Sequence, residues 1–233
     1  DKFSISDYKL DFGLQYTYKL NKKNTINIGA VYTLGRTLHG DAYKYHQTGA
    51  ESNGSIYVQS QTGDTIPNPF KMPHTFGIGL TYVYDNRLTI GVDYTLQKWN
   101  TADLAWSKFN KESVEMNSRT KIAFGAEFVP SYISHNYLKR IRYRMGAYYS
   151  SPYNKVSYTS PDTGTTSFQD GAREYGVSIG FGLPMFQSKS MLNISGQYIK
   201  VSPKFKGLME ENYLRINIGL TFNERWFMKW KVD

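Results

Sequence analysis

Apolar and polar residues alternate along most of the chain. The last alternating segment is the clearest, because a strict every-second-residue pattern runs through Leu214, Ile216, Ile218, Leu220 and Phe222. Successive side chains of a β-strand point to opposite faces, so this pattern predicts a strand with one apolar face and one polar face. We find no helical period of useful length.

Nine segments show this period-2 pattern and predict an all-β chain of about nine strands. Their apolar positions fall within residues 8–20, 26–34, 76–84, 88–96, 122–128, 141–149, 175–183, 192–198 and 214–222. These strands are longer than the roughly 5–6 residues typical of globular proteins and suit the roughly 9–11 residues of a tilted membrane strand. Soluble sandwiches also alternate, so alternation alone does not decide between the two.

The links between the predicted strands alternate between short and long. Short links occur at "NKKN", at the hairpin signal "DN", at "PSYISHNYLK" and at "FQSKS". The long links cover about 36–72, 98–117, 151–172 and 201–211. Outer-membrane barrels combine short periplasmic turns with long outer loops. We therefore expect a transmembrane antiparallel β-barrel over residues 1–223, with these four loops extracellular.

The two ends of the sequence add to this expectation. Residues 224–233 are rich in aromatic and basic side chains and predict a periplasmic C-terminal tail at the bacterial outer membrane. Bacterial single-chain barrels have even strand numbers, so nine strands suggest that the first part of the barrel precedes residue 1. "SIYVQSQ", residues 55–61, lies inside the longest loop and predicts a hairpin within that loop.

Composition is compatible with a barrel and excludes several other classes. The 233 residues are 40% hydrophobic and 16% aromatic, with no cysteine. The mean hydropathy of −0.52 is low, as expected when only alternate residues face lipid. The absence of cysteine excludes thiolate metal sites and a Cys nucleophile. The net charge of +9 is scattered along the chain without a recognition motif, so we expect no nucleic-acid partner.

Several stretches, in this order, resemble the FadL/TodX family of outer-membrane transporters. "MPHTFGIGLTYVYDNRLTIGVDYTLQKWNTADL" is similar to the family in its Pro73 ahead of a strand, its "DN" turn and its Trp99 at the outer end of the next strand. "RYRMGAYYSSP" and "REYGVSIGFGL" resemble two following strands. The resemblance covers roughly Tyr8 to Phe222, and the tail "NERWFMKWKVD" looks like that of members from the Bacteroidetes.

The resemblance implies a fourteen-stranded barrel with an N-terminal hatch, of which this chain would hold the last nine strands. It also implies diffusive uptake of long-chain fatty acids or other hydrophobic small molecules, captured by an outer loop. The corresponding loop here carries apolar residues that would form a capture groove: Leu38, Tyr43, Tyr45, Ile56, Tyr57, Ile66 and Phe70. The equal alternative is a loop that is disordered or faces lipopolysaccharide, because exposed apolar residues are common.

Charged residues share the polar face of the predicted strands. The plain interpretation is that they form ion pairs across a polar lumen, as in many barrels. The sharper hypothesis is that cationic and phenolic side chains bind the carboxylate of a passing ligand, because guanidinium groups pair well with carboxylates. The candidates for this role are Lys121, Arg142, Arg144, Tyr148 and Arg215.

Catalytic and metal chemistry have little support. The four histidines are His39, His46, His74 and His135, and none has an evident Ser and carboxylate beside it or a third metal ligand. We expect no enzyme, no cofactor and no metal. The alternative functions are a structural or docking barrel subunit of an outer-membrane complex and, less favoured, a lipid-modifying enzyme. The expected partners are membrane lipid, lipopolysaccharide, a hydrophobic ligand and other outer-membrane proteins.

Overall fold

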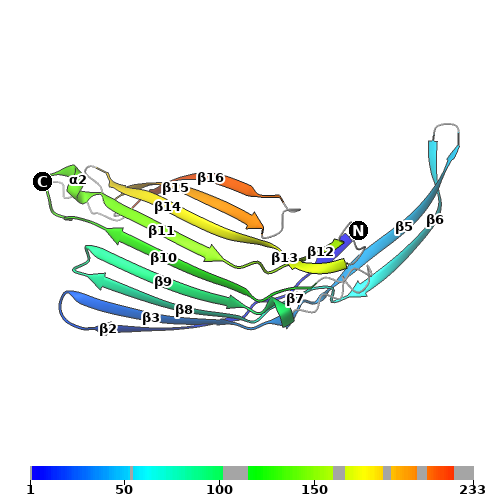
Figure 1. Cartoon of the computed structure of the whole chain (residues 1–233), viewed down its shortest axis with the longest axis horizontal. Helices are drawn as coiled ribbons and strands as arrows, with labels where there is room; N and C mark the ends of the chain where they lie inside the picture. Colours follow the sequence, from blue (N-terminus) through cyan, green and yellow to red (C-terminus); the bar gives the residue numbers. More distant parts are fainter. Residues whose placement is uncertain are drawn as a thin grey trace, which may run out of the picture.

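The computed structural model of the chain describes residues 2–52, 55–101, 115–159, 166–185, 190–203 and 209–222. This part is built almost entirely of antiparallel strands, nine of which form one sheet (Figure 1). These are β2 (Asp11–Lys19), β3 (Asn24–Thr33), β8 (Thr75–Tyr84), β9 (Leu88–Gln97), β10 (Arg119–Phe128), β11 (Arg142–Ser150), β14 (Ala172–Pro184), β15 (Met191–Pro203) and β16 (Glu211–Thr221). Each of the nine alternating segments is a strand of this sheet, which confirms the all-β prediction.

Smaller sheets lie at one end of the large one (Figure 1). β1 (Lys2–Ile5), β5 (Gly40–Ser52) and β6 (Ser55–Pro67) form a three-stranded sheet. β4 (Arg36–Thr37) pairs with β7 (Lys71–Met72), and β12 (Lys155–Thr159) with β13 (Thr166–Asp170). The β5–β6 hairpin projects far beyond the sheet, and we call it the arm (Figure 1). The hairpin predicted from "SIYVQSQ" is confirmed, because these residues lie in β6.

The large sheet is open, and its described strands form no closed barrel. It runs β16-β15-β14-β11-β10-β9-β8-β3-β2, so strands that follow one another in the sheet also follow one another in the chain. In the described part of the chain, β2 pairs only with β3 and β16 only with β15. The strands curl into a trough with β2 and β16 as its edges (Figure 1). The nine strands therefore form a curved wall that does not close into a ring.

The connections give the sheet two distinct ends. At one end the strands are joined by residues 34–74, 98–118, 151–171 and 204–210, and we call it the long-link end. At the other, the short-link end, the links are 20–23, 85–87, 129–141 and 185–190. The arm and β1 lie at the long-link end, and the one-turn helix α2 (Tyr137–Arg140) lies at the short-link end (Figure 1).

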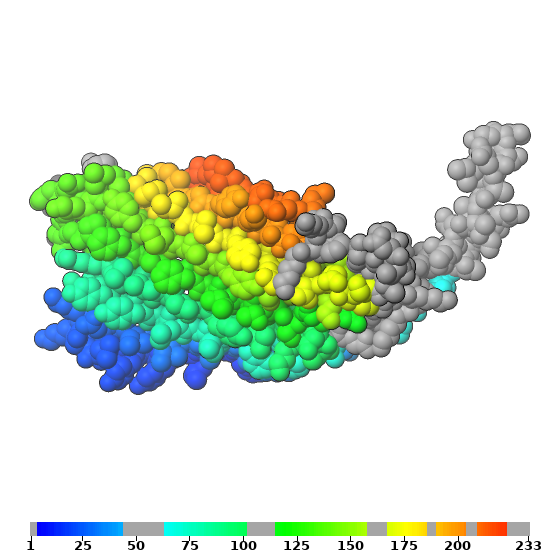
Figure 2. All heavy atoms as spheres, viewed as in Figure 1, coloured from blue at the N-terminus to red at the C-terminus, as the bar shows by residue number. Residues whose placement is uncertain are grey.

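The two faces of the sheet differ in chemistry. On the apolar face, side chains from across the sheet are widely exposed, as for Leu14 (75%), Ile179 (57%) and Leu214 (77%). Figure 2 shows the N-terminal strands, in blue, with side chains standing out separately along one rim. Within the described ranges, and apart from prolines such as Pro69, the buried apolar side chains are few, namely Ala42, Ile66, Val129, Ile141 and Ile199. Unlike the core of a soluble sandwich, this apolar face is covered by no second layer in the described part.

Local signals explain the turns. Asp85 and Asn86 adopt positive φ angles of 49° and 52° at the centre of the turn from Tyr84 to Arg87, which is closed by a hydrogen bond of 2.8 Å from the Arg87 N–H to the Tyr84 carbonyl. The alternating pattern predicts this hairpin but not α2, because four residues are too few to show a helical period. Asn136 caps α2, since its side chain accepts a hydrogen bond from the Leu138 N–H at 3.0 Å. Among the described residues no helix has the length and apolar character needed to span a membrane.

Candidate functional site

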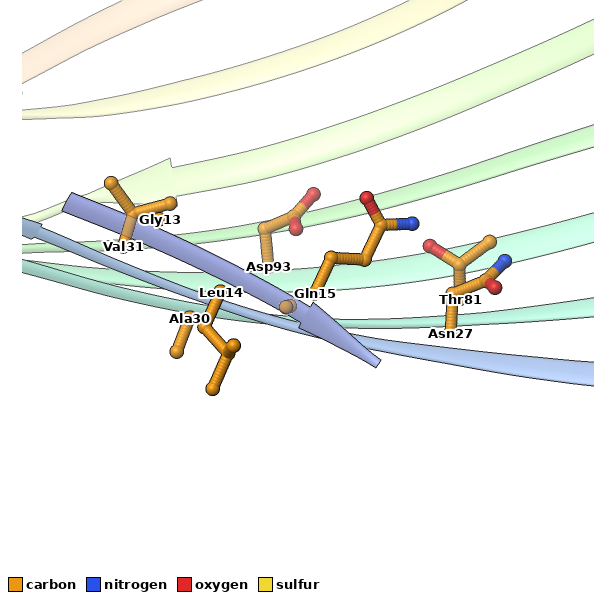
Figure 3. Close-up of a pocket in the computed structure, with 10 residues that line it drawn as sticks. Gly13, Leu14, Gln15, Asn27, Ala30, Val31, Thr81 and Asp93 are labelled. Atoms are coloured by element: carbon orange, nitrogen blue, oxygen red, sulfur yellow. The ribbon is translucent and has the colours of Figure 1, made fainter. Parts of the chain in front are cut away.

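The polar face of the sheet gathers the charged residues that the sequence singled out. Cross-strand partners share a face, and the registers place Lys121, Arg142, Arg144, Tyr148 and Arg215 together on this side. Figure 3 shows the same division farther along the sheet, where Gln15 and Asp93 point to the side enclosed by the trough and Leu14 points away. The predicted parity of the strands is therefore correct.

One charge cluster lies toward the short-link end. Glu127 accepts a hydrogen bond from Nε of Arg144 at 2.7 Å and another from Nη1 of Arg142 at 3.2 Å. The other side of Arg144 reaches across β14, where Nη1 donates to Oδ1 of Asn193 at 2.8 Å. The Asn193 amide in turn donates to the Thr221 hydroxyl at 3.3 Å. This chain of contacts joins β10, β11, β15 and β16.

Glycines of β14 make room for these long side chains. Gly180 pairs with Arg144 and Gly182 with Arg142. A Cβ atom at Gly182 would lie 3.1 Å from Cβ of Arg142, and one at Gly180 would lie 3.1 Å from Cβ of Ser195. Side chains at these two positions would crowd the Arg144 side chain where it extends over β14 to Asn193. The glycines are therefore needed for the hydrogen bonds that the arginines form.

A second cluster lies toward the long-link end. The Tyr148 hydroxyl donates to the Glu174 carboxylate, and the Lys121 ammonium lies 4.7 Å from the centre of the Tyr148 ring. Arg119 approaches the same carboxylate, with Nη2 at 3.7 Å from Oε2 of Glu174. The Tyr148 ring crosses Gly176, where a Cβ atom would lie only 2.0 Å from Cε1 of the ring.

These contacts favour the plain interpretation of the polar face. Lys121, Arg142, Arg144 and Tyr148 are each engaged by a side chain of a neighbouring strand, so they stabilise the sheet without any ligand. Arg215 differs, because it is exposed on the edge strand β16 and forms no ion pair within the described part of the chain. Binding of a ligand carboxylate by any of the five residues stays a prediction.

Between the two clusters, small residues form one row across the sheet. Gly91, Gly125, Gly146 and Ser178 stand in register on four neighbouring strands. A Cβ atom at Gly125 would meet nothing within 4 Å, so packing within the chain does not require this glycine. Glycine inside a strand often marks a close approach by another backbone or a ligand.

The polar face also carries two shallow hollows. One of about 480 Å³ lies over β2, β3, β8 and β9 and is lined by Gln15, Asn27, Thr81 and Asp93, among others (Figure 3). The other, of about 300 Å³, lies near β16, with Ser178, Asn193, Gln197 and Asn217 in its lining. Both linings include amide and hydroxyl groups, which suit hydrogen bonding with a polar surface.

The base of the arm is held by a network of separate segments. The Asp7 carboxylate, only 6% exposed, accepts a hydrogen bond from the His39 backbone N–H at 2.9 Å and lies 3.3 Å from Nη1 of Arg36. The pKa of Asp7 is lowered to about 2, chiefly by the hydrogen bond from the His39 N–H. Burial of the carboxyl group acts in the opposite direction, and the hydrogen bonds from the Tyr8 N–H and the His39 ring lower the pKa further. The N-terminal segment is thereby tied to the arm.

Backbone pairing and burial strengthen the same junction. β1 adds a third strand to the arm, and Ser4 approaches so closely that a Cβ atom at Gly40 would lie 2.3 Å from its carbonyl oxygen. Ala42 and Ile66 pair across the hairpin and are buried. Isolated two-stranded hairpins are marginally stable, so the third strand and this small core position the arm.

Of the seven proposed capture residues, Leu38, Tyr43, Ile66 and Phe70 have side chains within the described part of the chain. Ile66 is buried at the base, Tyr43 lies on β5, and Leu38 and Phe70 lie beside the arm, joined by a backbone hydrogen bond of 2.9 Å. The backbone of Tyr45, Ile56 and Tyr57 belongs to the arm, but their side chains lie outside the described part. From Ala42 to Glu51, opposite Ile56, the arm extends roughly 30 Å at about 3.3 Å per residue. Ligand capture by these residues stays a prediction.

No group of three or more His, Asp or Glu side chains that could hold a metal ion occurs within the described ranges. Taken together, the fold defines a curved antiparallel β-sheet protein with an exposed apolar face, a braced polar face, two unpaired edges and a projecting arm. The model of the BamG family matches residues 1–233, so the chain belongs to the BamG family. No curated protein and no solved structure matches the chain.

The family membership corrects the FadL/TodX resemblance, which was wrong. It also leaves fatty-acid transport without support, and it implies an association with the bacterial outer membrane. The features that suggested FadL/TodX were a proline ahead of a strand, a "DN" turn, Trp99 at the outer end of the next strand and two further strand-like stretches. Long antiparallel strands joined by tight turns and rich in aromatic residues share these features, so they are not specific to one family. The orientation of the C-terminus lies outside the described residues.

Proposed function

We propose that the chain is a non-enzymatic β-sheet subunit of an outer-membrane protein complex, namely the BAM complex with which the BamG family is associated. The observation that carries this proposal is the family match over the whole chain. It favours the docking alternative that the sequence left open over the transport of a small molecule.

The architecture supports a docking role in two ways. The apolar face carries exposed side chains across the whole sheet, as expected for a wall that contacts lipid on one side. The arm projects away from the sheet on a base fixed by β1 and by Asp7, and long hairpins of this kind present two strand edges to a partner. In this proposal the sheet anchors the subunit in the membrane and the arm contacts other subunits.

Affinity purification from native membranes tests the proposal. The protein, tagged in its natural cells and extracted in mild detergent, should co-purify with subunits of the BAM complex identified by mass spectrometry. A variant in which residues 45–63 are replaced by Asn-Gly keeps the paired base of the arm. It should co-purify with less or none of these subunits while the sheet remains folded. A matched control is Ile133→Ser, a change at a 92% exposed residue in a short link at the other end of the sheet.

The outcomes separate the subunit role from its details. Purification of the protein without any subunit of the BAM complex would overturn the proposal. If the variant with the shortened arm keeps all partners, the arm is not part of the interface, but the protein is still a member of the complex. A fluorescently labelled sheet that fails to co-migrate with outer membranes in density gradients would contradict the membrane anchor.

A further inference from the structure

An apolar groove lies on the exposed face of the sheet, beside the short-link end. It has a volume of about 360 Å³ and covers parts of β9, β10, β11 and β14. Its lining side chains come from two neighbouring cross-strand rows of the apolar face. The outer row holds Leu88, Phe128, Tyr143 and Phe181, and the inner row includes Ala126 and Met145.

The shape of the groove follows from the sizes of its residues. Ala126 lies between Ile90 and Met145 in the inner row, so its single methyl group leaves a gap between longer side chains. In the outer row the rings of Tyr143 and Phe181 meet edge to face, with centroids 5.9 Å apart. The lining is almost entirely apolar. A hydrocarbon chain matches such a lining, whereas a peptide segment would bring backbone N–H and C=O groups that find no partner there.

The links at the short-link end carry an excess of positive charge. Their described residues include five lysine or arginine side chains and a single acidic one, Asp85. The five basic residues are Lys22, Lys23, Arg87, Lys139 and Arg140. Nε of Arg87 lies 3.6 Å from Oδ2 of Asp85, and the other four form no ion pair within the described ranges. This end of the sheet therefore attracts anions.

Two of these cations are held next to the groove. The Tyr143 hydroxyl donates a hydrogen bond of 3.0 Å to the Leu138 carbonyl, so a ring that lines the groove contacts α2 directly. Lys139 and Arg140 follow Leu138 in this one-turn helix. The helix is fixed from its other side, because the Ser131 N–H donates to the Lys139 carbonyl at 2.8 Å. The apolar groove and the two cations therefore belong to one continuous surface.

We propose that the groove binds an acyl chain of an anionic glycerophospholipid, whose phosphate is bound by Lys139 and Arg140. This inference rests on the membrane role in the proposed function. Guanidinium and ammonium groups bind phosphate strongly, and long basic side chains extend from apolar surfaces to the headgroup level. An acidic protein segment would satisfy the charges but not the apolar lining. A zwitterionic lipid would fill the groove but leave the excess charge uncompensated.

Fluorescence quenching by brominated lipids tests the proposal. The chain has no cysteine, so a single fluorescent label is attached at Ile90→Cys, which lies beside Ala126 without lining the groove. Tyr94→Cys, on the same strand but farther from the short-link end, is the matched control. The protein is reconstituted in phosphatidylcholine vesicles that contain brominated phosphatidylglycerol or, separately, brominated phosphatidylcholine.

The expected result is a lipid preference at one label position only. At Ile90, half-maximal quenching should need about fivefold less brominated phosphatidylglycerol than brominated phosphatidylcholine, which is the factor expected for one basic residue near an anionic headgroup. At Tyr94 the two lipids should quench equally. The preference at Ile90 should decrease at high salt, because salt screens exposed charges.

Charge variants test the headgroup contact. Lys139→Gln combined with Arg140→Gln should abolish the preference at Ile90, whereas Lys139→Arg should keep it. Lys9→Gln combined with Lys71→Gln removes the same charge at the long-link end and should leave the preference unchanged. A preference that survives the first double variant would overturn the inference, as would equal quenching by the two lipids at Ile90 or an equal preference at the control position.

The same measurements separate this inference from the proposed function. If neither lipid quenches at either position while the protein stays folded, the apolar face is not in lipid, and the membrane anchor fails together with the inference. If both lipids quench equally at both positions, only the inference fails, and the subunit role still depends on co-purification with the BAM subunits. Lipopolysaccharide that removes the preference at lower concentration than unlabelled phosphatidylglycerol would overturn the assignment to a glycerophospholipid.

Discussion

Arg144 and Glu127 form a charged hydrogen bond between two central strands of the sheet, with Nε of Arg144 at 2.7 Å from Oε2 of Glu127. The same carboxylate also accepts a hydrogen bond from Arg142, so Glu127 on β10 binds the guanidinium groups of two arginines on the neighbouring strand β11. Because Arg144 continues to Asn193, removal of Glu127 affects contacts over several strands. The pair is therefore the best point at which to test whether the polar face is a structural brace.

Glu127→Ala should destabilise the sheet by about 1–2 kcal/mol. Hydrogen bonds to charged groups contribute about 1.5–3 kcal/mol, and the partial exposure of these side chains reduces that value. Urea unfolding of the protein in lipid vesicles, followed by Tyr and Trp fluorescence, measures the difference. Arg87→Ala removes the exposed 3.6 Å pair with Asp85 and should cost no more than about 1 kcal/mol. Equal losses in the two variants would contradict the bracing role.

Gly176→Leu should displace the Tyr148 ring from its place over β14. The Cβ atom alone would lie 2.0 Å from the ring, so Tyr148 must swing away and lose its bond to Glu174. Overpacking of this kind costs about 1–3 kcal/mol in the free energy of unfolding. The same urea experiment measures it.

Gly125→Ala is the matched control for Gly176, because both are polar-face glycines in central strands. A Cβ atom at Gly125 meets nothing within 4 Å, so the change should be neutral or stabilise the isolated protein by up to about 1 kcal/mol. If the glycine row contacts another backbone in the cell, the same change should weaken the complex while leaving the isolated sheet stable. Loss of stability in the isolated protein would show that this account of the row is wrong.

The tie between Asp7 and the base of the arm should weaken in acid. The carboxyl pKa of about 2 lies below its ordinary value of 3.8, so its stabilising contribution is complete above 3.8 and is lost as pH falls through about 2. Asp7→Asn should remove this contribution at every pH. The measurement is the rate at which pepsin cleaves the segment before β2. The rate for Asp7→Asn divided by the wild-type rate should be greater than one at pH 4 and close to one at pH 2. A ratio that does not change between these pH values would contradict the tie.

The sequence predicted the sheet far better than the contacts that complete it. Period-2 alternation is a local property, so strands such as β9 and β16 and the division into two faces were predictable. The Asp7–Arg36–His39 network and the bond from Arg144 to Asn193 join residues far apart in the chain, and no local pattern reveals them. The arm was predicted only as a loop hairpin, because nothing in "SIYVQSQ" indicates that the pairing continues over both 13-residue strands.

Substitutions at neighbouring residues of β14 decide whether the apolar face contacts lipid. Ile179 lies on the apolar face and is 57% exposed, whereas Ser178 lies on the polar face. If the face were in water, Ile179→Arg would change stability little, because exposed surface substitutions usually stay within about 0.5 kcal/mol. In a bilayer, an arginine on the lipid face near the midplane costs about 2–4 kcal/mol.

We therefore expect Ile179→Arg to destabilise the protein in vesicles by about 2–4 kcal/mol and Ser178→Arg to have a smaller effect. Unfolding in lipid vesicles measures both variants under the same conditions. Leu214→Arg, on the edge strand, adds a second lipid-face position, since Leu214 is 77% exposed. Its cost should be smaller than that of Ile179→Arg, because Leu214 lies nearer the long-link end and charged residues cost less close to the membrane interface. A small effect of Ile179→Arg that equals that of Ser178→Arg would place the apolar face against protein or water instead of lipid.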